Sequence, residues 1–155
     1  SPHRHKTKMS TLDISATGKG FGGLLSTSEA CGHELHCDYP EAWGGENKGP
    51  NPCEYLMVGL IGCEQMTVTE VAKEMGWDVT KAEFKAVMTL DMEKAATKPC
   101  QQPVKTLTLT ATVHGDITQE QVTELGELVH SRCTVAAIFR HLPGCECVHV
   151  WTKAE

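Results

Sequence analysis

The feature that most constrains the fold is a long helix predicted between residues 51 and 75. Asn51 is a favourable N-cap, Pro52 suits the first helical position, and Gly76 suits the position just after the last turn. From Tyr55 to Ile61 the segment is apolar on nearly every face, whereas a surface helix is polar on one side. The segment is therefore predicted to be a helix buried on most of its faces, around which the rest of the chain packs.

The rest of the chain has a pattern typical of an α+β fold. Apolar and polar residues alternate most regularly from Val104 to Val113, which predicts a strand with one apolar face. A capping box at residues 118–121 starts a second helix, and residues 131–142 either continue it or form a third. The order predicts an α+β class with a mostly antiparallel sheet, in which residues 84–92 and 104–113 pair as a hairpin. Weaker alternation predicts further strands at residues 11–17, 24–28, 32–38 and 145–151, with turn-rich or polar connections at 18–23, 39–50 and 94–103.

Length and charge exclude several classes of protein. A chain of 155 residues suits one domain with a real core, predicted here to span residues 11–155. The net charge of −6 offers no electrostatic basis for binding nucleic acid, and no apolar run approaches the roughly 18 residues that span a membrane. Residues 1–10 lack an acidic side chain and an apolar stretch, and are predicted to be a disordered arm or a remnant of cloning or of a targeting segment.

The eight cysteines are the most informative residue type. A disulfide framework would be expected in a short secreted chain, but this chain is long and shows no export signal, so most of the cysteines are predicted to be thiols. The predicted location is the cytoplasm, with an organelle matrix as the alternative. Cys63 and Cys133 lie in the two most apolar helical stretches. Each is either an inert small hydrophobe of the core or, if the two meet in one pocket, half of a redox pair.

The sequence that leads to Cys63 resembles a known signature. Residues 49–63 carry a proline-rich approach, Glu54 near the helix start, small apolar residues and then Cys63. This arrangement resembles the OsmC/Ohr family of osmotically inducible and organic hydroperoxide resistance proteins. Cys133 lies 70 residues further on, where the family has its second cysteine. The resemblance covers residues 11–152 and is closer to the OsmC-like branch than to the established peroxidases.

The resemblance implies a fold in which two chains interlock, with mostly antiparallel sheets wrapped around two central helices of the homodimer. It implies a thiol peroxidase of the antioxidant stress response, in which Cys63 attacks an organic hydroperoxide and Cys133 resolves the sulfenic acid. It further implies that an external dithiol, such as a lipoyl group, regenerates the enzyme, with no cofactor or metal. The alternative on the same fold is a non-catalytic dimer that binds an apolar ligand or acts as a redox-sensitive binding protein.

One departure from the resemblance concerns the positive charge at the site. The family's peroxidases hold the reactive thiolate with an arginine from the N-terminal strands, but this chain has no arginine between Arg4 and Arg132. Lys19 is the only cation in residues 11–30, and a lysine can lower the pKa of a thiol but cannot form the planar fork of a guanidinium. Lys19 is therefore the candidate supporting cation, and the missing arginine motivates the binding alternative.

Helix geometry restricts the part that Glu54 can play. It precedes Cys63 by nine residues, which on one straight helix is about 13.5 Å of rise and about 180° of rotation. The two side chains cannot touch on one helix. Glu54 therefore either completes the helix N-terminus or reaches a site built partly from the other chain.

The same geometry predicts neighbours for each thiol. Thr67 shares the helix face of Cys63 and could donate a hydrogen bond to the thiolate. On a continuous helix His130 lies three residues before Cys133, where it either lowers the pKa of that thiol or lines an interface. The pocket beside Cys63 is predicted to be apolar with one hydroxyl, which suits an alkyl peroxide, and its residues are Gly59, Leu60, Met66 and Thr67.

The remaining cysteines are open to several interpretations. Residues 31–37 hold two cysteines and two histidines, but in a strand one histidine points away from the other three side chains, which argues against a tetrahedral zinc site. Cys145 and Cys147 share a strand face and are soft-metal ligands, an adventitious disulfide pair or packing residues. Cys53 and Cys100 stay unassigned, and no metal site is predicted.

Overall fold

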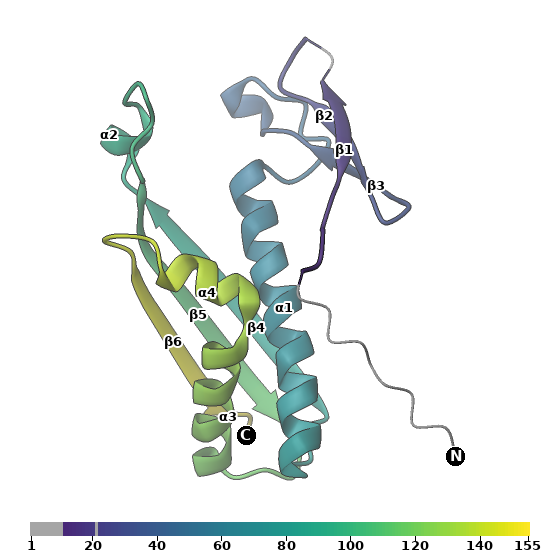
Figure 1. The fold of residues 1–155 in the computed structure, drawn as a ribbon, viewed down its shortest axis with the longest axis vertical. Coiled ribbons are helices and arrows are strands. Elements are labelled where there is room, and N and C mark those ends of the chain that lie inside the picture. Colours follow the sequence, from purple (N-terminus) through teal and green to yellow (C-terminus); the bar gives the residue numbers. More distant parts are fainter. Residues whose placement is uncertain (1–10, 21) are drawn as a thin grey trace. The chain divides into compact units, whose positions relative to one another are not determined.

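A computed structural model describes residues 11–20 and 22–155 of the chain. Residues 1–10, predicted to be an arm or a remnant, lie outside the described residues. The described chain forms two compact units, one ending at Pro52 and the other beginning at Cys53, and each has its own sheet (Figure 1). The single domain predicted for residues 11–155 stays a prediction.

The first unit is a meander of three short antiparallel strands, β1 (Thr17–Gly20), β2 (Ser26–Ala30) and β3 (His33–Cys37). The strand predicted at residues 32–38 is confirmed by β3. The short strand predicted at residues 24–28 is present as β2, shifted by two residues. A meander of two or three N-terminal strands is therefore found as expected.

The strand predicted at residues 11–17 is wrong. Residues 11–16 have no regular structure, and β1 lies mostly in the segment predicted to be a glycine-rich turn. Gly18 explains the difference, because a Cβ atom there would lie 2.6 Å from the Oγ atom of Ser28. Only glycine lets β1 approach β2 this closely, so a residue that usually marks a break is here part of a strand.

The loop after β3 is organised by one buried carboxylate. Asp38 is 1% exposed and accepts hydrogen bonds from the backbone N–H groups of Tyr39, Glu46 and Lys48 at 2.8, 3.0 and 3.1 Å. Burial by itself would raise the pKa of Asp38, but these hydrogen bonds and the charge of Lys48 hold that pKa below its ordinary value. The rest of the loop contains one 3-10 turn, η1 (Glu41–Trp43).

The second unit packs helices against a three-stranded sheet. The strand order is β4-β5-β6, with β4 antiparallel and β6 parallel to β5 (Figure 1). The predicted hairpin and the mostly antiparallel α+β fold are therefore confirmed. β6 is parallel because two helices carry the chain back across the sheet, which is the crossover that parallel pairing requires. In chain order the elements are α1 (Pro52–Met75), β4 (Lys81–Leu90), α2 (Met92–Ala95), β5 (Val104–His114), α3 (Gln119–Arg132), α4 (Thr134–Arg140) and β6 (Glu146–Lys153).

Helix α1 begins and ends where the sequence predicts. It runs from Pro52 to Met75, and Gly76 follows in the left-handed region with φ of +69°. Burial on most faces, however, is wrong for the single chain, because Leu56, Val58 and Met66 are 51%, 58% and 66% exposed. Neither α1 nor any other helix in the described part of the chain is long and apolar enough to cross a membrane.

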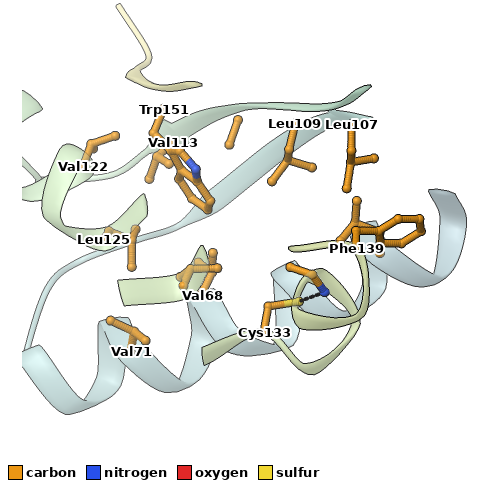
Figure 2. Packing of buried hydrophobic residues seen from close by; sticks show 14 of the residues in the cluster. Val68, Val71, Leu107, Leu109, Val113, Val122, Leu125, Cys133, Phe139 and Trp151 are labelled. Carbon is orange, nitrogen blue, oxygen red and sulfur yellow. Dashed lines mark hydrogen bonds between the residues drawn. The ribbon is translucent and has the colours of Figure 1, made fainter. Parts of the chain in front are cut away.

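The core of the second unit is one cluster of apolar side chains from α1, α3, α4 and the sheet (Figure 2). Val68 and Val71 of α1 belong to it, and so does Cys133, which is 0% exposed. The cluster therefore fixes α1 against the junction of α3 and α4. The face of β5 that was predicted to be apolar is buried in the same cluster and consists of Leu107, Leu109, Ala111 and Val113.

Candidate functional site

The helical region that starts at Thr118 is broken at Cys133. α3 ends at Arg132 and α4 begins at Thr134. Of the two predicted alternatives for residues 131–142, the separate third helix is therefore the one that the structure has. Cys133 has an extended backbone, with φ of −63° and ψ of 117°, and its Sγ atom accepts a hydrogen bond from the Ala136 N–H at 3.3 Å (Figure 2). The thiol is therefore the N-cap of α4, which holds it in one orientation.

This break brings Cys133 into contact with Cys63. Cys63 lies in the middle of α1 and is half-buried, whereas Cys133 is 0% exposed. Burial raises the pKa of Cys133 to about 12, and contacts with the Cys63 thiol and the Glu64 carboxyl group contribute, although the Ala136 N–H works in the other direction. Cys133 is therefore a thiol at neutral pH and lies beside the Cys63 thiol.

Glu64, which the sequence analysis missed, lies beside Cys133. It is 0% exposed, and within the described residues neither oxygen of its carboxyl group has a hydrogen-bond partner of good geometry. Burial raises the pKa of Glu64, and the Cys133 thiol and the Arg140 guanidinium offset this only in part. Helical spacing is the signal that would have found it, because Glu64 stands four residues after the buried Leu60.

A small cavity opens beside Glu64. Apolar side chains line most of it, and its other polar groups are His130 of α3 and Cys147 and His149 of β6. The rings of His130 and His149 stack with centroids 4.3 Å apart and planes at 16°. Burial lowers the pKa of His130 to about 4, and electrostatic interactions with His149 and Arg140 contribute, so its imidazole is neutral at pH 7.

The expectation that His130 lowers the pKa of Cys133 is wrong. It assumed a continuous helix, but the chain is extended at Cys133 and the pKa of that thiol is raised. The ring of His130 instead stacks on His149 and lines the cavity. Its second predicted role, as an interface residue, stays a prediction.

The structure locates the three other predicted supporting residues. Thr67 is buried, and its hydroxyl donates to the carbonyl oxygen of Cys63 at 2.8 Å, so its proton points at the backbone rather than at the thiol. Glu54 lies in the first turn of α1 and is exposed. Lys19 lies in β1 and is exposed as well. Support of the reactive thiol by Glu54 and Lys19 stays a prediction.

The predicted helix face of Cys63 is divided between core and surface. Leu60 and Thr67 are buried, whereas Gly59 and Met66 are exposed. In the single chain, apolar side chains of the core therefore surround Cys63 on one side only. On the other side lies the exposed apolar face of α1.

The remaining cysteines include one close pair. Cys145 and Cys147 have Sγ atoms 3.8 Å apart, which agrees with the shared strand face. Burial raises the pKa of Cys147 to about 11, and the neighbouring Cys145 thiol contributes. Among the residues that the structure describes, no group of three or more histidine, cysteine or acidic side chains could hold a metal.

The sequence also matches a family of known proteins. Residues 45–147, which contain both Cys63 and Cys133, match the model of the family described as OsmC-like protein. The chain belongs to the OsmC-like protein family. The resemblance found from the sequence around Cys63 is therefore confirmed. A search among curated proteins found no match.

Solved structures share the fold of this OsmC-like protein. An OsmC-like protein from Mycoplasma pneumoniae matches with a TM-score of 0.81 at 16% identity, over 95% of this chain and 100% of that chain. An organic hydroperoxide resistance protein OsmC from Legionella pneumophila matches with a TM-score of 0.65 at 17% identity, over 90% of this chain and 99% of that chain. One from Elizabethkingia anophelis matches with a TM-score of 0.68 at 21% identity, over 92% of this chain and 99% of that chain. At these identities the likeness shows a common fold.

The half-buried His130 predicts that this OsmC-like protein loses stability in mild acid. The pKa of His130 is about 4 in the folded chain and 6.5 ordinarily, so the unfolded chain binds more protons between these pH values. The stabilising contribution of the neutral ring is therefore complete above pH 6.5 and is lost as the pH falls toward 4. We expect the melting temperature of the wild type to fall over this range by on the order of a few degrees more than that of His130→Gln.

Circular dichroism melts of the reduced protein at half-unit pH steps measure this difference. His33→Gln, which replaces an exposed histidine of β3, serves as the control and should follow the wild type. Equal pH slopes for the wild type and His130→Gln would show that His130 does not carry the effect.

Proposed function

We propose that this OsmC-like protein is a thiol-dependent peroxidase that reduces organic hydroperoxides through Cys63 and Cys133. The observation that carries the proposal is the contact between the Cys63 thiol and the buried thiol of Cys133. Two solved structures with this fold are named organic hydroperoxide resistance proteins, which supports the substrate class.

The surroundings of the two thiols support their separate roles. A peroxide has to reach the attacking thiol, whereas a resolving thiol only has to reach its partner. Cys63 is half-buried, and Cys133 is 0% exposed with a pKa raised to about 12. Cys63 is therefore the peroxidatic thiol of the proposal and Cys133 the resolving thiol.

The proposed cycle has three steps. The Cys63 thiolate attacks one peroxide oxygen, the O–O bond breaks, and the alkoxide takes a proton and leaves as the alcohol. The Cys133 sulfur then attacks the sulfenic acid of Cys63, and the S–O bond breaks as the S–S bond forms and water leaves. An external dithiol, such as a lipoyl group, reduces this disulfide by exchange and becomes a disulfide itself.

The proposal includes a homodimer that pairs through α1. The exposed apolar side chains Leu56, Val58 and Met66 lie on this helix, and an apolar surface of this kind is typical of an interface. Glu54 lies on the same helix. Pairing through α1 is therefore the arrangement in which Glu54 could support a site built from both chains.

Consumption of cumene hydroperoxide in the presence of dihydrolipoamide tests the proposal. Stopped-flow rates for the wild type should exceed those of Cys63→Ser by at least about a thousandfold, the scale expected when a nucleophile is lost. Cys100→Ser replaces an exposed thiol and should keep the wild-type rate. In a separate assay without reductant, one equivalent of peroxide should remove two free thiols per chain from the wild type and none from Cys63→Ser.

Two results would contradict the peroxidase. A wild-type rate no higher than that of Cys63→Ser would remove the enzymatic activity. An unchanged thiol count after one equivalent of peroxide would favour the alternative, a dimer that binds an apolar ligand without turnover.

A further inference from the structure

Glu64 is the one acidic side chain in the described chain that is buried with both oxygens lacking a hydrogen-bond partner. Removing a carboxyl group from water without such partners costs several kcal/mol, so a buried group of this kind needs a reason. The helix would be easier to pack with an apolar residue at this position, since Leu60 and Val68, four residues to either side, are buried apolar residues of the core.

Among the described residues, no cation forms an ion pair with Glu64. On the α3–α4 side, the neutral His130 lines the same cavity, and the Arg140 guanidinium donates to the backbone carbonyl oxygens of His130 and Ser131. On the sheet side, β5 contributes only Leu107 and Leu109 to the cavity. The titratable and charged groups that face Glu64 are Cys133, His130 and Arg140 on the α3–α4 side, and Cys147 and His149 on β6.

We propose that the Glu64 carboxyl group is the proton relay of the resolving step: it accepts the proton of the Cys133 thiol and passes a proton to the leaving hydroxide. The inference rests on the peroxidase proposed above and adds a residue to its second step. The Cys133 thiol touches both groups that the relay needs, the Cys63 thiol on one side and the Glu64 carboxyl group on the other.

The step balances without a further reactant. The Cys133 Sγ atom attacks the Sγ atom of the Cys63 sulfenic acid, and the S–O bond breaks as the S–S bond forms. The Glu64 carboxyl group accepts the thiol proton and passes a proton to the departing hydroxide, which leaves as water. Glu64 ends in the protonation state in which it began, so one residue serves as both proton acceptor and proton donor.

Burial makes Cys133 a poor nucleophile, and a proton relay would overcome this. With its pKa raised to about 12, very little Cys133 is a thiolate at pH 7, and the thiolate is the nucleophile. A thiol in this position attacks at a useful rate only if a neighbouring group takes its proton during the attack. General acid–base catalysis of this kind contributes about 10²- to 10⁴-fold.

Glu64→Gln removes the relay with little change of shape, because an amide fills the same volume but cannot pass a proton on. A single-turnover experiment on the full chain with one equivalent of cumene hydroperoxide separates the two steps. Trapping with dimedone follows the sulfenic acid, and the free-thiol count follows the disulfide. We expect Glu64→Gln to oxidise Cys63 within about twofold of the wild-type rate and to close the disulfide about a hundredfold more slowly, so that the sulfenic acid accumulates.

The pH profile of disulfide formation distinguishes a relay from a packing role. In Glu64→Gln only the Cys133 thiolate can attack, so the rate should rise about tenfold per pH unit between pH 6 and 8. In the wild type it should rise far less steeply. Glu64→Asp keeps a carboxyl group and should restore part of the rate, and Glu70→Gln, an exposed change on the same helix, should match the wild type.

Each result decides for or against the relay. Equal rates of disulfide formation in the wild type and Glu64→Gln would remove the relay and leave the peroxidase standing. Equal slowing of both steps with an unchanged pH profile would assign Glu64 to packing alone. A wild type that never oxidises Cys63 would overturn both proposals. If Glu64→Gln fails to fold, the wild-type profile decides, because a tenfold rise per pH unit there contradicts the relay.

Discussion

Cys133→Ser will leave the first oxidation of Cys63 intact and abolish its conversion to a disulfide. Serine is close in shape to cysteine and is a favoured N-cap, so the Ala136 N–H keeps an acceptor and α4 keeps its cap. The change therefore removes the proposed resolving thiol but keeps the helix cap that Cys133 provides. Without a second thiol the sulfenic acid of Cys63 persists, and excess peroxide oxidises it to the irreversible sulfinic acid.

Mass spectrometry after treatment with cumene hydroperoxide measures this outcome. One equivalent without reductant should cost the wild type two thiols and leave no dimedone adduct, whereas Cys133→Ser should lose one thiol and form the adduct on Cys63. Excess peroxide should inactivate the variant after about one turnover by oxidation to the sulfinic acid. Cys147→Ser, which replaces the other thiol near Glu64, serves as the control and should behave as the wild type. Accumulation of sulfenic acid in Cys147→Ser instead would move the resolving role to Cys147.

The sequence predicted the parts of the fold that depend on local signals. Proline at the first turn and glycine after the last one mark the two ends of α1, and Thr118 forms the capping box expected of it. The period-two pattern of β5 predicted which of its faces is buried, because side chains alternate strictly along a strand. These features need no information from distant parts of the chain.

The parts that were mispredicted depend on what a residue meets in three dimensions. Thr11 to Ala16 alternates like a strand, but Leu12 and Ile14 are 70% and 90% exposed. Within the described chain, these two apolar side chains therefore do not pack into a core. Gly18 lies in a strand because of a close approach to β2 that local rules cannot anticipate.

The part of the candidate site that was predictable also depends on local signals. Apolar helical context and the resemblance together selected Cys63 and Cys133, which the structure brings into contact. The helix break at Cys133 was open, since neither proline nor glycine marks it and a thiol is not among the preferred N-caps. Glu64 was overlooked because a charged residue in a helix is ordinarily assigned to the solvent face, and only its spacing from buried neighbours indicates otherwise.

Gly126→Val will destabilise the second unit by about 3 kcal/mol or more, at the upper end of the usual cost of overpacking. A Cβ atom on Gly126 of α3 would lie 2.5 to 2.9 Å from three atoms of the Trp151 ring. That ring is 7% exposed and packs edge-on against Phe84 at 5.9 Å, so it has little room to move. Replacing a helical glycine ordinarily gains at most about 1 kcal/mol of helix propensity, which is smaller than the clash.

Urea denaturation of the reduced protein at fixed concentration measures this destabilisation, and a double-mutant cycle identifies its cause. Trp151→Leu removes the ring that the new side chain strikes, and by itself it leaves a cavity and costs stability. In the double variant the two losses should be less than additive, because the introduced isopropyl group then occupies part of the space that the ring leaves. Strict additivity would mean that the cost of Gly126→Val does not come from the packing of α3 on β6.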